Sequence, residues 1–125
     1  MALSWQQLLK KVKGEIREIS TNELNEVLKK ESIWIIDVRD QDEFMKGHLP
    51  NAILLPRSFL ELRIENTISD RNEKIVLYCG GGNRSALAAR SLQEMGYTQA
   101  FSLEGGFSQW RREGKPVEFP KEIAS

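Results

Sequence analysis

At 125 residues, the chain is long enough for one domain with a real hydrophobic core. Its 18 basic and 18 acidic residues balance, so no net field favours binding to nucleic acid or to an anionic membrane. A single cysteine, Cys79, and a single histidine, His48, exclude an internal disulfide framework and leave a Cys/His zinc site short of ligands.

The N-terminal residues lack the continuous apolar core of a signal peptide, and no apolar run is long enough to cross a bilayer. A lone thiol suits a reducing compartment. We therefore expect a cytoplasmic protein with no membrane contact.

Trp5, Leu8, Leu9 and Val12 recur at helical spacing, and the lysines at positions 10, 11 and 13 lie mostly on the other side. This pattern predicts an amphipathic helical extension over residues 1–15, followed by a main domain over 16–120 and a tail over 121–125. The helix packs on the body or docks a partner, and a membrane-surface role is the less favoured alternative.

The first half of the main domain alternates short strands and helices. A strand is expected over residues 15–19, a helix with a capping box at Ser20 and Glu23, and a buried strand over 33–36 that ends at Asp37. A short helix follows between Asp40 and Gly47, and then a strand over 52–55 that Pro56 ends.

The second half continues the alternation. A helical or irregular segment is expected over 59–64, a turn over 69–72, a buried strand over 74–78 and a helix from about 85 that ends at Gly96. A core strand over 100–103 and a short helix with Phe107 and Trp110 in the core complete the domain. Strands that alternate with helices predict an α/β fold with a mainly parallel sheet.

Cys79 stands where the strand over 74–78 ends and the next helix begins. Three glycines follow it, and they allow backbone N–H groups to turn inward around the sulfur. The helix N-terminus and Arg84 add positive charge, and both favour the reactive thiolate over the thiol. A structural role as a small buried hydrophobe is the alternative, but such a cysteine does not need three consecutive glycines.

At this point the chain resembles the rhodanese family of sulfurtransferases, over residues 16–117. Three segments carry the resemblance in the family's order and spacing. They are Ile36-Asp37-Val38-Arg39 with Glu43-Phe44, Gly47-His48, Asn51-Ala52 and Pro56; the loop 79–85; and Leu103-Glu104-Gly105-Gly106-Phe107 with Trp110 and Gly114-Lys115-Pro116-Val117. The resemblance implies a single rhodanese-like domain, with a five-stranded, mainly parallel sheet and helices on both faces.

The resemblance also implies a mechanism without a cofactor or metal. Cys79 takes a sulfane sulfur from a small donor such as thiosulfate, holds it as a persulfide, and passes it to cyanide in an assay or to a cellular thiol or acceptor protein. The residues expected to bind the donor and the persulfide are Gly80, Gly81, Gly82, Asn83, Arg84 and Ser85. Ser85 is also expected to cap the following helix. No second cysteine is present to resolve the persulfide, so the acceptor comes from outside the chain.

Other residues of the matched segments are interpreted as structural. Asp37 and Arg39 suit an internal ion pair, and His48 a hydrogen bond within a turn. Asn51 stands where the family usually has glycine, and asparagine tolerates the left-handed backbone. The sequence leaves open whether Asp37, His48 or Arg57 contributes to the pocket.

Two other functions remain as alternatives. Cysteine-dependent phosphatases and arsenate reductases of the related fold have five residues between cysteine and arginine, whereas four separate Cys79 from Arg84 here. The shorter loop suits one sulfur atom better than a tetrahedral oxyanion. A non-catalytic interaction module is the second alternative, and the intact cysteine loop argues against it.

Overall fold

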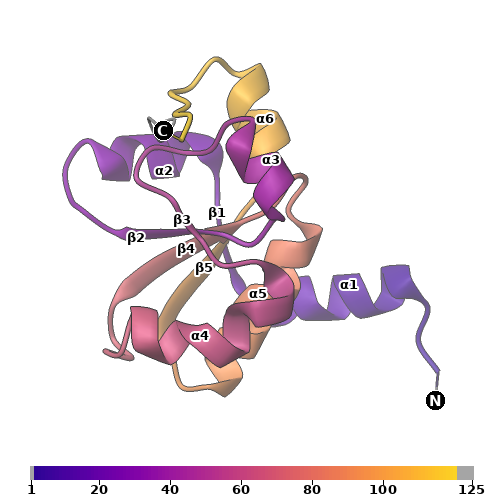
Figure 1. Ribbon diagram of the computed structural model, residues 1–125. Coiled ribbons are helices and arrows are strands. Elements are labelled where there is room, and N and C mark those ends of the chain that lie inside the picture. Colours follow the sequence, from indigo (N-terminus) through magenta and orange to yellow (C-terminus); the bar gives the residue numbers. More distant parts are fainter. Residues whose placement is uncertain (1, 121–125) are drawn as a thin grey trace.

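A computed structural model describes residues 2–120, in which five strands form one parallel sheet with the order β1-β5-β4-β2-β3 (Figure 1). The strands are β1 (Arg17–Ile19), β2 (Trp34–Asp37), β3 (Ile53–Leu54), β4 (Lys74–Tyr78) and β5 (Gln99–Leu103). The α/β class and the five-stranded parallel sheet predicted from the sequence are confirmed.

Residues 2–120 also form six α-helices and one 3-10 turn. They are α1 (Trp5–Glu15), α2 (Thr21–Leu28), α3 (Gln41–Met45), η1 (Arg57–Phe59), α4 (Leu60–Thr67), α5 (Asn83–Glu94) and α6 (Gly106–Arg112). In Figure 1, α1, α4 and α5 lie on one side of the sheet, and α2, α3 and α6 lie on the other. Helices therefore flank both faces, as expected for parallel strands.

Alternation along β4 divides the core between the two faces. Ile75, Leu77 and Cys79 pack with the helices α4 and α5, while Val76 and Tyr78 pack with α2 and α6. A run of apolar residues without a polar face is what a strand covered on both sides requires. Cys79 thus leaves the sheet on the α5 side.

The connections place the carboxyl ends of β2 and β4 at a topological switch point. From β2 the chain moves outward to β3, whereas from β4 it moves in the opposite direction to β5. Connections that diverge in this way leave a crevice at the carboxyl edge, where open α/β sheets bind their ligands. Cys79 directly follows β4 at this edge.

Several boundaries differ from the sequence prediction. The helix α1 runs through Glu15, so β1 starts only at Arg17. The strand β3 is limited to two residues, and α5 starts at Asn83 rather than near 85. The capping box at Ser20 and Glu23 is present, and Asn51 has the left-handed φ of 62° that was expected there. The expected tail over 121–125 lies outside the described residues.

Only the second half of α1 packs on the body. Val12 is buried and α1 contacts α5, whereas Trp5 and Leu8 are exposed. Figure 1 shows the start of α1 projecting away from the rest of the molecule. The apolar stripe predicted for this helix is therefore half covered.

Candidate active site

The Cys79 sulfur lies in a cradle of backbone amides at the start of α5. The N–H groups of Gly82 and Ser85 donate to the sulfur at 3.1 and 3.4 Å, and the Ser85 hydroxyl lies 3.5 Å away. The side chain of Cys79 is almost fully buried, with a relative exposure of 1%. Several donors thus converge on one atom where a helix N-terminus adds partial positive charge.

These donors change the acidity of the thiol. Burial raises the pKa of Cys79, but hydrogen bonds from the Ser85 hydroxyl and from the amides of Ser85, Gly82 and Gly81 lower it, and the net pKa is below the usual value for cysteine. A buried structural cysteine without such donors would have a raised pKa. The environment therefore favours a nucleophilic thiolate.

Ser85 does not cap the helix, contrary to the sequence prediction. The N-cap of α5 is Gly82, and Ser85 is the third helical residue. A side chain at this position points back over the first turn, which directs the hydroxyl to the sulfur instead of to a free amide. The same hydroxyl contacts Ser102 of β5 at 2.8 Å, a partner that no local sequence pattern indicated.

The three glycines of the loop are not equivalent. Only Gly82 has a left-handed backbone, with φ of 97°, and a Cβ at Gly80 or Gly81 would have room. The sequence predicted that the three glycines allow the amides to turn inward, but it did not distinguish between the three positions. Gly82 is the position where the left-handed conformation favours glycine over other residues.

A second loop holds the cysteine loop from behind. The amides of Phe107 and Ser108, in the first turn of α6, donate to the carbonyls of Cys79 and Gly80 at 2.8 and 2.9 Å. A Cβ at Gly106 would lie 2.5 Å from the Cys79 oxygen. With both carbonyls held by α6, the amides of the loop are left free to face the sulfur.

Arg84 lies at the entrance of the loop rather than inside it. Its side chain is 47% exposed, passes close to Gly80, and is paired with Glu43 of α3 at 3.4 Å. Burial lowers the pKa of Arg84, but the charges of Glu43, Cys79 and Asp40 raise it overall. An exposed guanidinium within reach of the thiolate's field is placed to attract an anion. Asn83, beside it at the start of α5, is exposed.

A cleft of about 360 Å³ adjoins Arg84 at the carboxyl edge of the sheet. It is bordered by the segments that follow β2 and β3, and Arg57 is among the residues that line it. Arg57 binds Glu61 through two contacts of 2.8 Å and also reaches Ser91. The structure thus places Arg57 in the lining of this cleft, whereas the sequence left open whether it contributes to the pocket.

Asp37 and Arg39 form the internal ion pair that the sequence predicted. Both are buried, the Arg39 guanidinium donates to the carboxylate through Nε and Nη2, and the Tyr78 hydroxyl donates to the same carboxylate at 2.7 Å. Burial raises the pKa of Tyr78 well above its usual value, and the Asp37 charge raises it further. The Tyr78 hydroxyl in turn accepts a hydrogen bond from the backbone amide of Leu49.

His48 serves the same framework. Its Nδ1 contacts the carbonyl of Leu49 at 2.7 Å, its ring stacks on Phe44, and its backbone pairs with Glu118. These contacts agree with the structural role predicted for it. In residues 2–120, no cluster of three or more His, Cys, Asp or Glu side chains could hold a metal.

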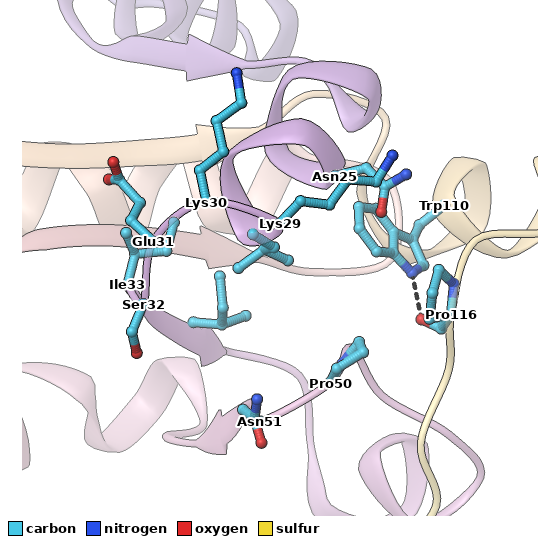
Figure 2. A pocket seen from close by; sticks show the side chains of 12 residues that line it. Asn25, Lys29, Lys30, Glu31, Ser32, Ile33, Pro50, Asn51, Trp110 and Pro116 are labelled. Carbon is cyan, nitrogen blue, oxygen red and sulfur yellow. Dashed lines mark hydrogen bonds between the residues drawn. The ribbon is translucent and has the colours of Figure 1, made fainter.

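Another cleft, of about 650 Å³, lies at the opposite edge of the sheet (Figure 2). It is bounded by the end of α2, the residues that lead into β2 and β3, and Trp110, whose indole N–H donates to the carbonyl of Pro116. Figure 2 shows Lys29 beside Asn25 and Lys30 extending away from the cleft. Because this edge carries the amino ends of the strands, the cleft is remote from Cys79.

Comparison with known proteins agrees with this geometry. The profile of the rhodanese-like domain family matches residues 20–113, well over half of the chain. The chain belongs to the rhodanese family. The matched range includes the cysteine loop, the Asp37–Arg39 pair and the first turn of α6.

Relatives of this rhodanese-like chain bear names that refer to sulfur transfer. A sulfurtransferase of Allochromatium vinosum is 32% identical over 107 residues, covering 85% of this chain and 98% of that protein. A thiosulfate sulfurtransferase GlpE of Coxiella burnetii is 37% identical over 95 residues, covering 76% and 87%. Among solved structures, a protein of unknown function from Rhodopseudomonas palustris, described as a possible tyrosine phosphatase, superposes with a TM-score of 0.86 at 30% identity, covering 94% and 96%.

No helix within residues 2–120 is both long and apolar enough to span a bilayer.

Proposed function

We propose that this protein is a sulfurtransferase that carries a sulfane sulfur as a persulfide on Cys79. The observation that carries the proposal is that the Cys79 sulfur accepts hydrogen bonds from the N–H groups of Gly82 and Ser85. The loop that provides these groups is held in place by the backbone amides of α6. Donors fixed in this way stabilise an anionic sulfur without reorganisation, as an oxyanion hole does for oxygen.

The proposed reaction has two displacement steps. In the first, the Cys79 thiolate attacks the outer sulfur of thiosulfate, an S–S bond forms to Cys79, and the S–S bond of the donor breaks to release sulfite. In the second, an external nucleophile such as cyanide or a thiolate attacks the terminal sulfur, and the Cys79 thiolate is regenerated as the leaving group. Charge and atoms balance in both steps, and neither needs a cofactor.

Named residues support each requirement of this reaction. The lowered pKa of Cys79 supplies the thiolate at the start of the first step. The exposed guanidinium of Arg84 attracts the dianionic donor to the entrance of the loop. The acceptor of the second step is a cellular thiol or a protein acceptor, and the exposed start of α1 is a candidate docking surface for such a protein.

Intact-protein mass after incubation with thiosulfate tests the proposal. The wild type is expected to gain one sulfur, about 32 mass units, and to lose it on addition of cyanide, whereas Cys79→Ser gains nothing. If the folded, reduced wild type gains no sulfur from thiosulfate or from an organic persulfide donor, the proposal is wrong.

The main alternative is hydrolysis of phosphate esters. The loop has four residues between Cys79 and Arg84, and its amides close to about 3 Å from a single sulfur atom. A cradle of that size favours a sulfur over a tetrahedral phosphate. Substantial, Cys79-dependent hydrolysis of p-nitrophenyl phosphate without sulfur loading would support the phosphatase alternative, and a cellular role that survives Cys79→Ala would support the interaction module.

A further inference from the structure

A second buried hydroxyl lies behind the serine that contacts the active sulfur. Ser102 of β5 is fully buried, and its Oγ lies 2.8 Å from the Ser85 Oγ, which lies 3.5 Å from the Cys79 sulfur. Neither the fold nor the displacement mechanism described above makes use of Ser102. The side chains of Ser102, Ser85 and Cys79 thus form a hydrogen-bonded series that leads from the interior of the sheet to the sulfur.

We propose that Ser102 is a positioning residue, whose hydroxyl directs the Ser85 hydroxyl onto the Cys79 thiolate. This inference rests on the proposed role of Cys79 as the sulfur nucleophile. The proposal gives Ser102, a residue of β5, a part in preparing the cysteine for reaction.

Counting donors and acceptors shows which group donates to which in this hydrogen-bonded series. Each serine hydroxyl has one proton to donate and can accept two. In the thiolate state, Ser102 donates to Ser85 and Ser85 donates to the sulfur, so both protons are used and the final bond is charge-assisted. Among the described residues, Ser102 Oγ has no other side-chain or loop partner than Ser85.

The thiol state cannot use the same protons as well. If the Cys79 S–H donates to Ser85, then Ser85 donates to Ser102 and the Ser102 proton has no acceptor. If the hydroxyls instead donate as in the thiolate state, Ser85 donates to a neutral sulfur, which is a weak acceptor. A buried donor without a good acceptor is unfavourable, so the pair of hydroxyls favours the thiolate. Hydrogen bonds in series also polarise one another, which strengthens the bond to the charged atom.

The position of Ser102 within the sheet supports a role beyond packing. In β5, Ser102 pairs with Leu77 of β4 and shares the α5 side of the sheet with Ala100, among apolar side chains. A hydroxyl buried there loses its hydration, and alanine would fill the position without that loss. The contact to Ser85 is the compensation that the structure shows.

The test is a titration of the Cys79 thiol by its ultraviolet thiolate absorbance in purified full-length protein. The matched variants are Ser102→Thr and Ser102→Val, which have the same shape and differ only in the hydroxyl. We expect the midpoint of Ser102→Val to lie at higher pH than that of Ser102→Thr, with about threefold less thiolate at a fixed pH below both midpoints. Ser102→Ala, which only removes atoms, repeats the test if the added methyl group of the first two variants prevents folding.

A Ser85→Ala background separates a role through Ser85 from a general effect on the core. In that background the Ser102 variants are expected to share one midpoint, because the Ser85 hydroxyl that links Ser102 to the sulfur is absent. Equal midpoints in the wild-type background, or the same difference in both backgrounds, would overturn the proposal. The titration requires no sulfur donor, so its result is independent of whether Cys79 forms a persulfide.

Discussion

Arg84 is the cationic residue at the entrance of the cysteine loop, and its present partner is an acidic side chain. The contact to Glu43 is long, at 3.4 to 3.5 Å, and both side chains are more than a third exposed. Such a pair contributes little stability. If the protein takes an anionic donor as proposed, that donor can displace Glu43 from the guanidinium at small cost, and we expect the pair to affect donor capture more than stability.

Substitution of either member should change donor capture in opposite directions. Arg84→Gln is expected to lower kcat/KM for thiosulfate about tenfold, the effect of one lost hydrogen bond to a charged group. Glu43→Gln is expected to raise it about twofold, because it frees the guanidinium. Steady-state kinetics with thiosulfate and cyanide measure both values, and an unchanged kcat/KM in Arg84→Gln would contradict this role.

Gly82 and Gly81 offer a matched pair within one loop. Alanine at Gly82 must adopt a φ of 97° and contact the Gly105 amide, whereas alanine at Gly81 meets nothing within 4 Å. We expect Gly82→Ala to lower the free energy of unfolding by about 1–3 kcal/mol. We also expect it to raise the pKa of Cys79, since the Gly82 N–H would no longer point at the sulfur. Gly81→Ala should stay within about 0.5 kcal/mol of wild type.

Urea unfolding and thiolate absorbance provide the two measurements. Equal losses of stability in the two variants would show that the left-handed conformation of Gly82 is not what the loop requires.

At the scale of elements, the cysteine loop depends on its packing against the turn that starts α6. The two carbonyls that follow β4 are held by α6 amides, and Gly106 is the point of closest approach. The site is thus built from two strand-to-helix junctions on neighbouring strands, β4–α5 and β5–α6. Each junction is local in sequence, but their contact is not.

Gly106→Ala tests the contact between the junctions. The added Cβ would lie 2.5 Å from the Cys79 carbonyl oxygen, so we expect a loss of about 3 kcal/mol in stability and of most sulfur loading. Gly114→Ala is the control, because Gly114 shares the left-handed backbone but has open space around it. That variant should lose only about 1 kcal/mol and load sulfur normally.

The difference between these two variants, in thermal unfolding and intact mass, isolates crowding from backbone strain. If Gly114→Ala also fails to load sulfur, the effect of Gly106→Ala cannot be assigned to the cysteine loop.

The elements that the sequence predicted well are those with a strong local pattern. The run Lys74–Tyr78 followed by Cys79 and a helix was predicted because buried strands and helix starts leave local signals. The Asp37–Arg39 pair was predicted for the same reason, since its members are two residues apart. The end of the first helix agrees with the extension predicted over residues 1–15, but the start of β1 was predicted two residues early, because α1 continues through Glu15.

The parts of the site that the sequence could not give depend on strand order. Ser102 meets Ser85 because β5 lies beside β4, and no periodicity within either segment encodes that neighbour. The one available signal was a hydroxyl within the otherwise apolar strand over 100–103. Tyr78 gave a similar signal, a polar aromatic residue at the end of a buried strand.

For the molecule as a whole, the buried charge of Asp37 joins three parts of the chain. The carboxylate at the end of β2 binds Arg39 and the hydroxyl of Tyr78 on β4, and Arg39 also donates to the carbonyl of Gly47. These contacts fix the carboxyl edge of the sheet, where the cysteine loop begins. A buried pair of this kind is costly to break from one side.

Asp37→Asn should therefore destabilise the protein by about 3–5 kcal/mol, because it leaves the Arg39 charge without its partner. Glu31→Gln, which breaks an exposed pair with Lys74, should cost under about 1 kcal/mol. Urea denaturation compares the two variants. Below the unfolding transition, Asp37→Asn is expected to keep its sulfur loading within about twofold, and a complete loss in folded protein would instead place Asp37 in the reaction.

The hold of α6 on the carbonyls of Cys79 and Gly80 has a consequence during synthesis of the chain. A ribosome produces the cysteine before it produces Phe107 and Ser108, whose amides complete the loop. At translation rates of about 5–20 residues per second, the thiol exists for a few seconds without its activating surroundings. We expect the thiol to have the acidity of an ordinary cysteine in that interval, and the amides around the sulfur to be fixed in place only when β5 and α6 are released and can close over the loop.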